Sequence, residues 1–377
     1  MEFTEQEWLK NNVLMSGNAG ELWLTGVSGE VSFSLKAEDA SVPSSEEISF
    51  VLLPDAKGRI HLDMRKILEG TAPFLRSGIS EVPDDEFDSV LFLKKFTLTA
   101  SQGEDSVSIS RHVVSGGSPD DGEAEALLSS EYFWTRRPQV APTWREAEET
   151  LCLLPLPDVP GRLCARVYSR MLPPEVISFG PQWDMAPYSE QGMAALLMFN
   201  CSGRRVCEAA AAAGYAETVE AYDIIRIDGD AEGRFCQRFI VRDGHVHTFL
   251  FRNSLGGYDT IHAGSDRKKS MESESVLIVS GMEEKELKND HYVSHEECSG
   301  YLGSEEEANF WYEFLASDER YIVLDGRRRR IIVEESDSET TENNVKSMTF
   351  RWHFAKEPEG FVQKRNVLDE IYIPEEI

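Results

Sequence analysis

Hydrophobic and polar residues alternate along most of the periodic segments of this chain, and this pattern predicts β-strands rather than helices. Short turns rich in Gly, Pro and Asp separate the segments of the first 116 residues. We predict strands over 21–25, 31–35, 48–52, 59–63, 90–100 and 107–114. Gly26–Gly29 predicts a hairpin between the first two strands, and Met64–Glu69 predicts a short helical turn. The block is typical of a β-sandwich of immunoglobulin-like size.

A second strand-rich block covers roughly residues 146–265. We predict its strands at 150–156, 163–171, 176–179, 194–199, 221–227, 234–241 and 245–251. Turn residues at short intervals again favour a sandwich or a partial barrel. The run Ala209–Ala213 could form a helical turn, but Gly214 follows it before any amphipathic face develops.

The third block differs because it contains the one convincing helix. Ser304 can cap a helix that runs to Leu315, Glu307 lies at the capping-box spacing, and Ala308, Trp311 and Phe314 form an apolar stripe. We predict strands at 275–279, 321–324, 329–334 and 347–355.

These patterns predict a mainly β fold of several antiparallel β-sandwiches, immunoglobulin-like or fibronectin-like, with a few short helices. The small, polar and acidic run Ser115–Gly122 indicates a boundary, and Ser265–Lys269 resembles a linker. We therefore expect four parts. They are an N-terminal sandwich (1–116), a connector (117–145), a second sandwich (146–267), and a C-terminal α+β or β domain (268–377) with its helix at 304–317.

Composition narrows the classes of function. The net charge of −29 with no compensating basic domain argues against a nucleic-acid binder, and it disfavours contact with anionic membranes. The acidic N-terminus shows no secretory signal, and no apolar run reaches the length of a membrane span. We expect synthesis in the cytoplasm. The six cysteines form no Cys-x-x-Cys pair, which favours free and mostly buried thiols over a disulfide scaffold or metal site.

Two groups of residues are candidate metal ligands. His245 and His247 share one face of a strand, and His262 can return near them, but no acid or thiol completes the set by spacing. A solvated strand face is therefore the preferred interpretation.

The second group, Asp228, Asp230 and Glu232, has the spacing of the start of a calcium loop. Phe239 stands where that loop requires a bidentate Glu, so a hairpin turn is the more economical interpretation.

No catalytic motif is visible, and we expect neither an enzyme nor a cofactor. The basic run Arg327–Arg330 is followed by an acidic run, which favours pairing within the chain or with an acidic surface on a partner. Trp23, Trp134, Trp144 and Trp183 could form a sugar-stacking platform, although packing in a core or hinge is the preferred interpretation because large aromatic residues are usually buried.

The most specific motif is Phe251-Arg-Asn-Ser-Leu-Gly-Gly-Tyr-Asp259, in which an apolar strand runs into a Gly-Gly turn. We expect Asn253 and Asp259 to bind turn amides, and Gly256 and Gly257 to allow positive φ and close backbone approach. These four residues form a predicted structural corner.

This corner resembles one that recurs in poorly characterised structural proteins of phages and prophages, often near tail genes. The C-terminal stretch is similar to the same group in its helix with Phe314-Leu-Ala-Ser317, its basic hairpin into Ile331–Glu334 and its closing strand Ser347–Trp352. The turn Pro54–Gly58 leading into Ile60–Asp63 also fits.

The resemblance spans most of the chain, is motif-specific at the Gly-Gly corner, and carries over no catalytic residue. It implies a multi-domain, tail-associated or virion component that works by assembly, with itself or other structural proteins as partners. The alternative is a carbohydrate-binding or adhesive β-sandwich protein, for which a glycan would be the partner.

Overall fold

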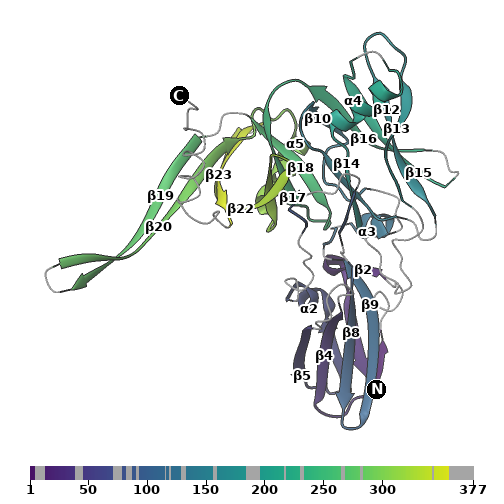
Figure 1. Ribbon diagram of the computed structural model, residues 1–377. Coiled ribbons are helices and arrows are strands. Elements are labelled where there is room, and N and C mark those ends of the chain that lie inside the picture. Colours follow the sequence, from purple (N-terminus) through teal and green to yellow (C-terminus); the bar gives the residue numbers. More distant parts are fainter. Residues whose placement is uncertain are drawn as a thin grey trace, which may run out of the picture. The chain divides into compact units, whose positions relative to one another are not determined.

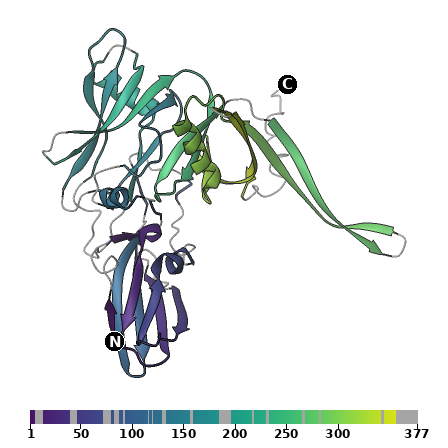
Figure 2. The same cartoon turned by 180° about the vertical axis from the view of Figure 1, so that it is seen from behind.

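The structure is a computed structural model, shown as a ribbon in Figure 1 and from behind in Figure 2. It describes residues 1–4, 13–38, 46–70, 79–81, 87–90, 93–114, 116–118, 120–128, 133–155, 159–183, 196–215, 218–229, 233–264, 268–280, 283–341 and 344–355. The chain divides into two compact units. The first unit holds Met1–Gly244 and Arg252–Thr260, and the second holds His245–Phe251 and Ile261–Ile377.

The N-terminal part of the first unit contains two sheets that share one hydrophobic core. One sheet has the order β1 (Glu2–Thr4), β3 (Glu21–Thr25), β6 (Arg59–Asp63). The other has the order β2 (Val13–Met15), β9 (Asp105–Val114), β8 (Leu93–Gln102), β4 (Val31–Glu38), β5 (Glu46–Leu52). The 3₁₀ turn η1 (Ser16–Asn18) and the helix α2 (Met64–Gly70) complete this part. Alternate residues of the strands enter the core, among them Leu22 and Leu24 of β3 and Phe33 and Leu35 of β4.

The predicted hairpin between residues 21–25 and 31–35 is wrong. β3 pairs with β1 and β6, whereas β4 pairs with β5 and β8, so the connection crosses from one sheet to the other. Val27 of this connection is buried, and its amide donates to the carbonyl of Gly58. Alternation could not distinguish the two topologies because both strands present apolar residues to the same core.

The second part of the first unit also has two sheets around one core. The five-stranded sheet has the order β10 (Val140–Trp144), β16 (Arg234–Arg242), β15 (Ala221–Asp228), β12 (Gly161–Tyr168), β13 (Glu175–Trp183). The three-stranded sheet has the order β11 (Thr150–Leu153), β14 (Leu196–Asn200), β7 (Phe87–Val90). β10 comes from the stretch that we expected to be a connector, and it pairs in parallel with β16.

Two further helices belong to the first unit. The helix α3 (Asp121–Leu128) lies within the stretch 117–145 that we expected to be a connector. The helix α4 (Gly203–Ala212) is longer than the predicted turn, and Ser202 caps it by accepting from the Arg205 amide. Val206 and Ala210 of α4 enter the core, so the apolar face is made by small residues that the periodicity did not reveal.

The second unit is built on a seven-stranded sheet. Its order is β18 (Tyr258–Gly264), β17 (Val246–Arg252), β21 (Arg320–Leu324), β22 (Arg327–Thr341), β23 (Asn344–Phe354), β20 (Glu283–Cys298), β19 (Lys268–Ser280). The helix α5 (Glu305–Ala316) packs Phe310, Trp311 and Phe314 into the core of this unit. Ser304 caps α5 by accepting from the Glu307 amide at 3.1 Å, as the capping-box spacing predicts.

The sequence missed β20. Its residues, Glu283–Cys298, are mostly charged and polar, and they show no alternation of hydrophobic and polar positions. β20 instead forms a long antiparallel ribbon with β19, which begins seven residues before the predicted strand 275–279.

The prediction of a mainly β fold with antiparallel sheets and a few short helices is confirmed. Two strand pairs, β10 with β16 and β2 with β9, are parallel. The division into four parts stays a prediction. Within the described residues, no helix is both long enough and apolar enough to span a bilayer.

Candidate functional site

The Gly-Gly corner is held by the side chain of Asn253. Its Nδ2 donates to the carbonyl of Trp134 at 2.9 Å and to Oδ2 of Asp259 at 2.7 Å. Its Oδ1 accepts from the Gly257 amide at 3.0 Å, and its own amide donates to the Gly257 carbonyl at 2.8 Å. The buried side-chain amide of Asn253 therefore closes the turn and fixes it to the backbone at Trp134.

The two glycines of the corner serve different purposes. Gly256 has φ +96°, a conformation that residues with a Cβ rarely adopt. Gly257 is needed for space, because a Cβ there would lie 2.2 Å from the Trp134 carbonyl oxygen. The sequence predicted both properties but could not assign them to individual glycines.

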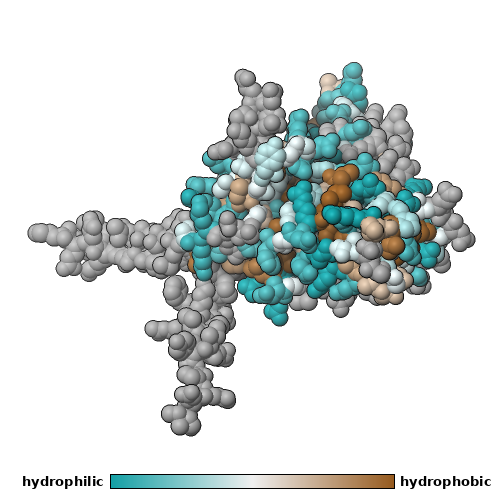
Figure 3. Space-filling view, turned by 90° about the horizontal axis from the view of Figure 1, so that it is seen from above, coloured by the Kyte–Doolittle hydropathy of each residue, from teal (hydrophilic) through white to brown (hydrophobic). Residues whose placement is uncertain are grey.

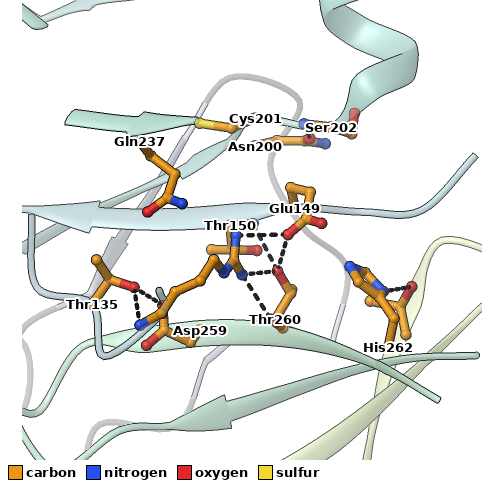
Figure 4. A network of polar contacts seen from close by, with 12 residues as sticks. Thr135, Glu149, Thr150, Asn200, Cys201, Ser202, Gln237, Asp259, Thr260 and His262 are labelled. Carbon is orange, nitrogen blue, oxygen red and sulfur yellow. Dashed lines mark hydrogen bonds and ion pairs between the residues drawn. The ribbon is translucent and has the colours of Figure 1, made fainter. Parts of the chain in front are cut away.

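Asp259 is fully buried and accepts from three donors. These are the Thr135 hydroxyl at 2.5 Å (Figure 4), the Arg136 amide at 3.0 Å and the Asn253 side chain. Burial raises the pKa of Asp259, and the Arg137 charge and the three donors oppose that shift. Asp259 thus anchors the segment at 135–136, in addition to the turn residue Asn253.

A buried ion pair contacts Thr260, the residue that follows Asp259 on β18. Nη1 of Arg137 lies 2.8 Å from Oε2 of Glu149, and both side chains are almost completely buried. Thr260 accepts from Arg137 at its carbonyl (2.7 Å) and its hydroxyl (2.6 Å), and the hydroxyl donates to Glu149 at 2.6 Å (Figure 4). A buried pair of charges requires such additional hydrogen bonds to offset the cost of desolvation.

The two groups of contacts form what we call the corner network, consisting of Asn253, Asp259, Arg137, Glu149 and Thr260. Its contacts join a turn, the segment before β10 and the segment before β11, all within the first unit. Every charge in it is buried and has a partner inside the protein. Such a network fixes the relative positions of strands, which is a structural role.

The predicted histidine candidates have partners inside the second unit. Nδ1 of His247 lies 3.0 Å from Oε2 of the buried Glu297, and Nδ1 of His262 lies 3.2 Å from the Thr248 hydroxyl. His245 is exposed. In the part of the chain that the structure describes, no three His, Cys, Asp or Glu residues are arranged to hold a metal ion.

The calcium-loop candidates are described only in part, because Asp230 and Glu232 lie outside the described residues. Asp228 is at the end of β15, and its carboxylate forms an ion pair with the buried Arg226 at 2.8 Å. Gly229 follows with φ +55°, and its amide donates to the Pro160 carbonyl.

The four tryptophans proposed as a platform lie in different settings. Trp134 and Trp183 are buried in the first unit. Trp23 is half-buried beside His61 and the Arg59 guanidinium, and Trp144 is half-buried beside the Arg242 guanidinium. Core packing therefore accounts for two of them.

The basic run forms the start of β22 after a tight turn at Asp325 and Gly326, both with positive φ. Arg328 is buried whereas Arg327, Arg329 and Arg330 are exposed, and Arg329 lies over the Phe354 ring.

Sequence reasoning missed Arg137, Glu149 and Thr260. These residues lie in segments without periodicity or any recognised motif, and contacts across 110 residues or more join Thr260 to the other two. The only available signal was the presence of charged residues beside the buried aromatic residue Trp134.

No family model matches the sequence, and no curated protein matches it. Weak likenesses to solved structures exist. A chain in the "Tail of empty GTA particle computed with helical refinement, C6 symmetry" is 14% identical with a TM-score of 0.20, over 29% of this chain and 92% of that chain. A chain in the "Virion of native gene transfer agent (GTA) particle" is 15% identical with a TM-score of 0.19, and the match covers 29% of this chain and 92% of that chain. TM-scores this low carry no argument about fold or function.

Proposed function

We propose that this protein is a non-catalytic structural subunit of a phage or prophage tail-like assembly and acts through protein–protein contacts. The observation that carries the proposal is the ribbon formed by β19 and β20. The resemblance of the corner Phe251–Asp259 to phage structural proteins supplies the kind of assembly.

The ribbon is long and has little support from the rest of its sheet. β19 and β20 pair from Lys268–Glu296 to Ser280–Glu283. Among the described residues, β20 pairs with β23 only at His295–Cys298. Figure 1 shows the two strands continuing beyond their neighbours in the sheet.

A ribbon of this kind is an unusual feature for a protein that functions alone. An isolated two-stranded ribbon is marginally stable in water, and its unpaired edges can bind another strand. A partner that pairs with an edge or packs on a face would stabilise it. We infer that the ribbon is ordered by contact with a neighbouring subunit.

The polar groups inside the protein support a structural role as well. The corner network uses its charges to connect backbone segments, and its side chains are buried. Burial raises the pKa of the Cys236 thiol to about 12 and also raises the pKa of Cys201, Cys164 and Cys207. These thiols are thereby disfavoured as nucleophiles at neutral pH.

Purification of particles produced by the host locus tests the proposal. We expect the chain in intact particles at a fixed stoichiometry, visible by mass spectrometry and electron microscopy. A variant in which a short Gly-Ser turn replaces residues 272–292 should fold but fail to enter particles.

The matched control is Gly103→Asn in the β8–β9 turn, because Gly103 has φ +63° with no atom within 4 Å of an added Cβ, and Asn tolerates this conformation. This variant should enter particles normally. Absence of the wild-type chain from particles, or normal assembly without the ribbon, would show that the proposed function is wrong.

A further inference from the structure

One face of the five-stranded sheet, which we call the arginine face, is directed away from the core of the first unit. Cross-strand register places Val176, Arg166, Asp223, Arg238 and Val140 in one row across the five strands. Side chains opposite one another in a sheet point to the same side. The intervening residues, such as Ile177 and Tyr222, point into the core.

The arginine face is positively charged. Arg162 and Arg166 of β12 and Arg238 and Arg242 of β16 point outward at alternate positions. Among the described residues at outward positions of these strands, Asp223 is the one acid. This face therefore carries a surplus of positive charge on a chain whose net charge is −29.

Large apolar side chains lie between the arginines. Val140, Val176, Phe235 and Ile240 are 52%, 51%, 43% and 39% exposed. Figure 3 shows hydrophobic and hydrophilic residues interspersed on the face of the molecule seen from above. Arginine combined with aliphatic and aromatic residues is typical of the centre of protein–protein interfaces.

The centre of the arginine face is rigid. Arg238 donates to the buried Asp223 from Nε at 2.6 Å and from Nη2 at 2.8 Å, and its guanidinium lies over the Tyr168 ring. The Tyr168 hydroxyl donates to the same carboxylate at 2.6 Å. Fixed side chains lose little conformational entropy on binding, which favours affinity.

We infer that the arginine face binds the acidic β22–β23 hairpin of a second copy of this chain. Residues Glu334–Glu339 of β22 include four acids and no base. Within the hairpin Glu334 pairs with His353 at 2.9 Å and Glu335 with Arg351 at 3.4 Å, and Asp337 is exposed. The pairing of β21 with β22 ends at Ile331, so among the described strands only β23 pairs with this stretch. Charge complementarity selects this occupant.

A second copy fits better than a nucleic acid. The apolar residues between the arginines have no counterpart on a phosphate backbone, and the net charge of the chain repels polyanions. Because the two surfaces are different, the contact is heterologous and can build a ring or a filament. The second copy is thus the partner in the proposed assembly, and the biological setting of this contact rests on the proposed function.

Sedimentation velocity over a range of protein concentration tests the inference. We expect the full chain to self-associate, and more weakly at high salt. Arg166→Glu and Asp337→Lys should each weaken self-association by at least about tenfold. Arg204→Glu makes the same charge change at an exposed position on α4, outside the arginine face, and should leave association unchanged.

Mixing the two variants provides the decisive measurement. The Arg166→Glu chain keeps its hairpin and the Asp337→Lys chain keeps its arginine face, so the two chains should bind each other in an equimolar mixture although each associates only weakly alone. Circular dichroism establishes that both variants fold. A wild-type chain that stays monomeric, a mixture that stays monomeric, or binding of an oligonucleotide in place of a second copy would overturn the inference.

The two proposals can fail separately. A chain that enters particles but does not self-associate in solution would refute this inference and leave the proposed function standing. A chain that self-associates as described but is absent from particles would refute the proposed function alone.

Discussion

Gly257→Ala is the sharpest test of the corner network, because it adds a single methyl group at a position with no room for it. The new Cβ would lie 2.2 Å from the Trp134 carbonyl oxygen and 2.9 Å from the Trp134 Cβ. The turn must move away. That movement disturbs the Asn253 bond to the Trp134 carbonyl and the bond from the Gly257 amide to Asn253.

The expected loss of stability follows from these contacts. Overpacking costs about 1–3 kcal/mol. Each disturbed buried hydrogen bond adds about 1 kcal/mol, and more where a buried group is left without a partner. We expect Gly257→Ala to lower the free energy of unfolding by about 3–6 kcal/mol in total. The larger Gly257→Val should unfold or misassemble the protein, since this loss is comparable with the whole stability of a domain.

Urea unfolding followed by tryptophan fluorescence measures the effect, and hydrogen exchange locates it at the corner. Gly203→Ala is the control because Gly203 is also buried in the first unit, yet its added Cβ would meet other atoms only at 3.6 Å or more. We expect a change within about 1 kcal/mol for this control. A Gly257→Ala protein as stable as the control would refute the assigned close contact, and a fully assembling Gly257→Val protein would show that the corner is dispensable.

Three further predictions concern charges and a helix cap. Arg137→Met or Glu149→Gln alone should each destabilise the protein by about 3–5 kcal/mol, while the double variant should lose less than the sum, as a double-mutant cycle by urea unfolding can measure. Burial has the largest single effect on the pKa of Asp223 and raises it. The hydrogen bonds from Arg238 and Tyr168 together outweigh burial and hold the pKa below its ordinary value of 3.8. The ionised Asp223 therefore stabilises the protein above pH 3.8, and this stabilisation is lost as the pH falls below that value. Thermal unfolding of Asp223→Asn should show a weaker dependence of stability on pH in this range. An unchanged dependence would contradict the assignment. Ser304→Ala should cost about 1 kcal/mol by removing the cap of α5, whereas Ser304→Asp should retain stability in the same thermal assay.

Much of the fold could be predicted from local patterns. Alternation identified most strands, including those at Glu21–Thr25 and Ala221–Asp228. The capping residue Ser304 and the stripe containing Trp311 and Phe314 identified α5. These elements were predictable because their signals lie in consecutive residues and follow from the geometry of the strand and the helix.

The candidate site was predictable only in outline. The motif itself indicated a turn held by Asn253 with glycines at its tip, because amide side chains and glycines have specific effects on local backbone. The partners of the turn lie more than 100 residues away, at Trp134 and Thr135. No local pattern connects such distant segments.

The sequence by itself determined a mainly β protein with a strong acidic charge, one well-capped helix and a specified Gly-Gly turn. Only the tertiary structure decided that Glu21–Thr25 and Val31–Glu38 belong to different sheets, that Arg137 and Glu149 form a buried pair, and that Glu283–Cys298 forms a ribbon. The physical reason is the range of the interactions. Strand and helix periodicity depends on residues close together in the sequence, whereas strand partners and buried ion pairs depend on segments that meet only in the folded chain.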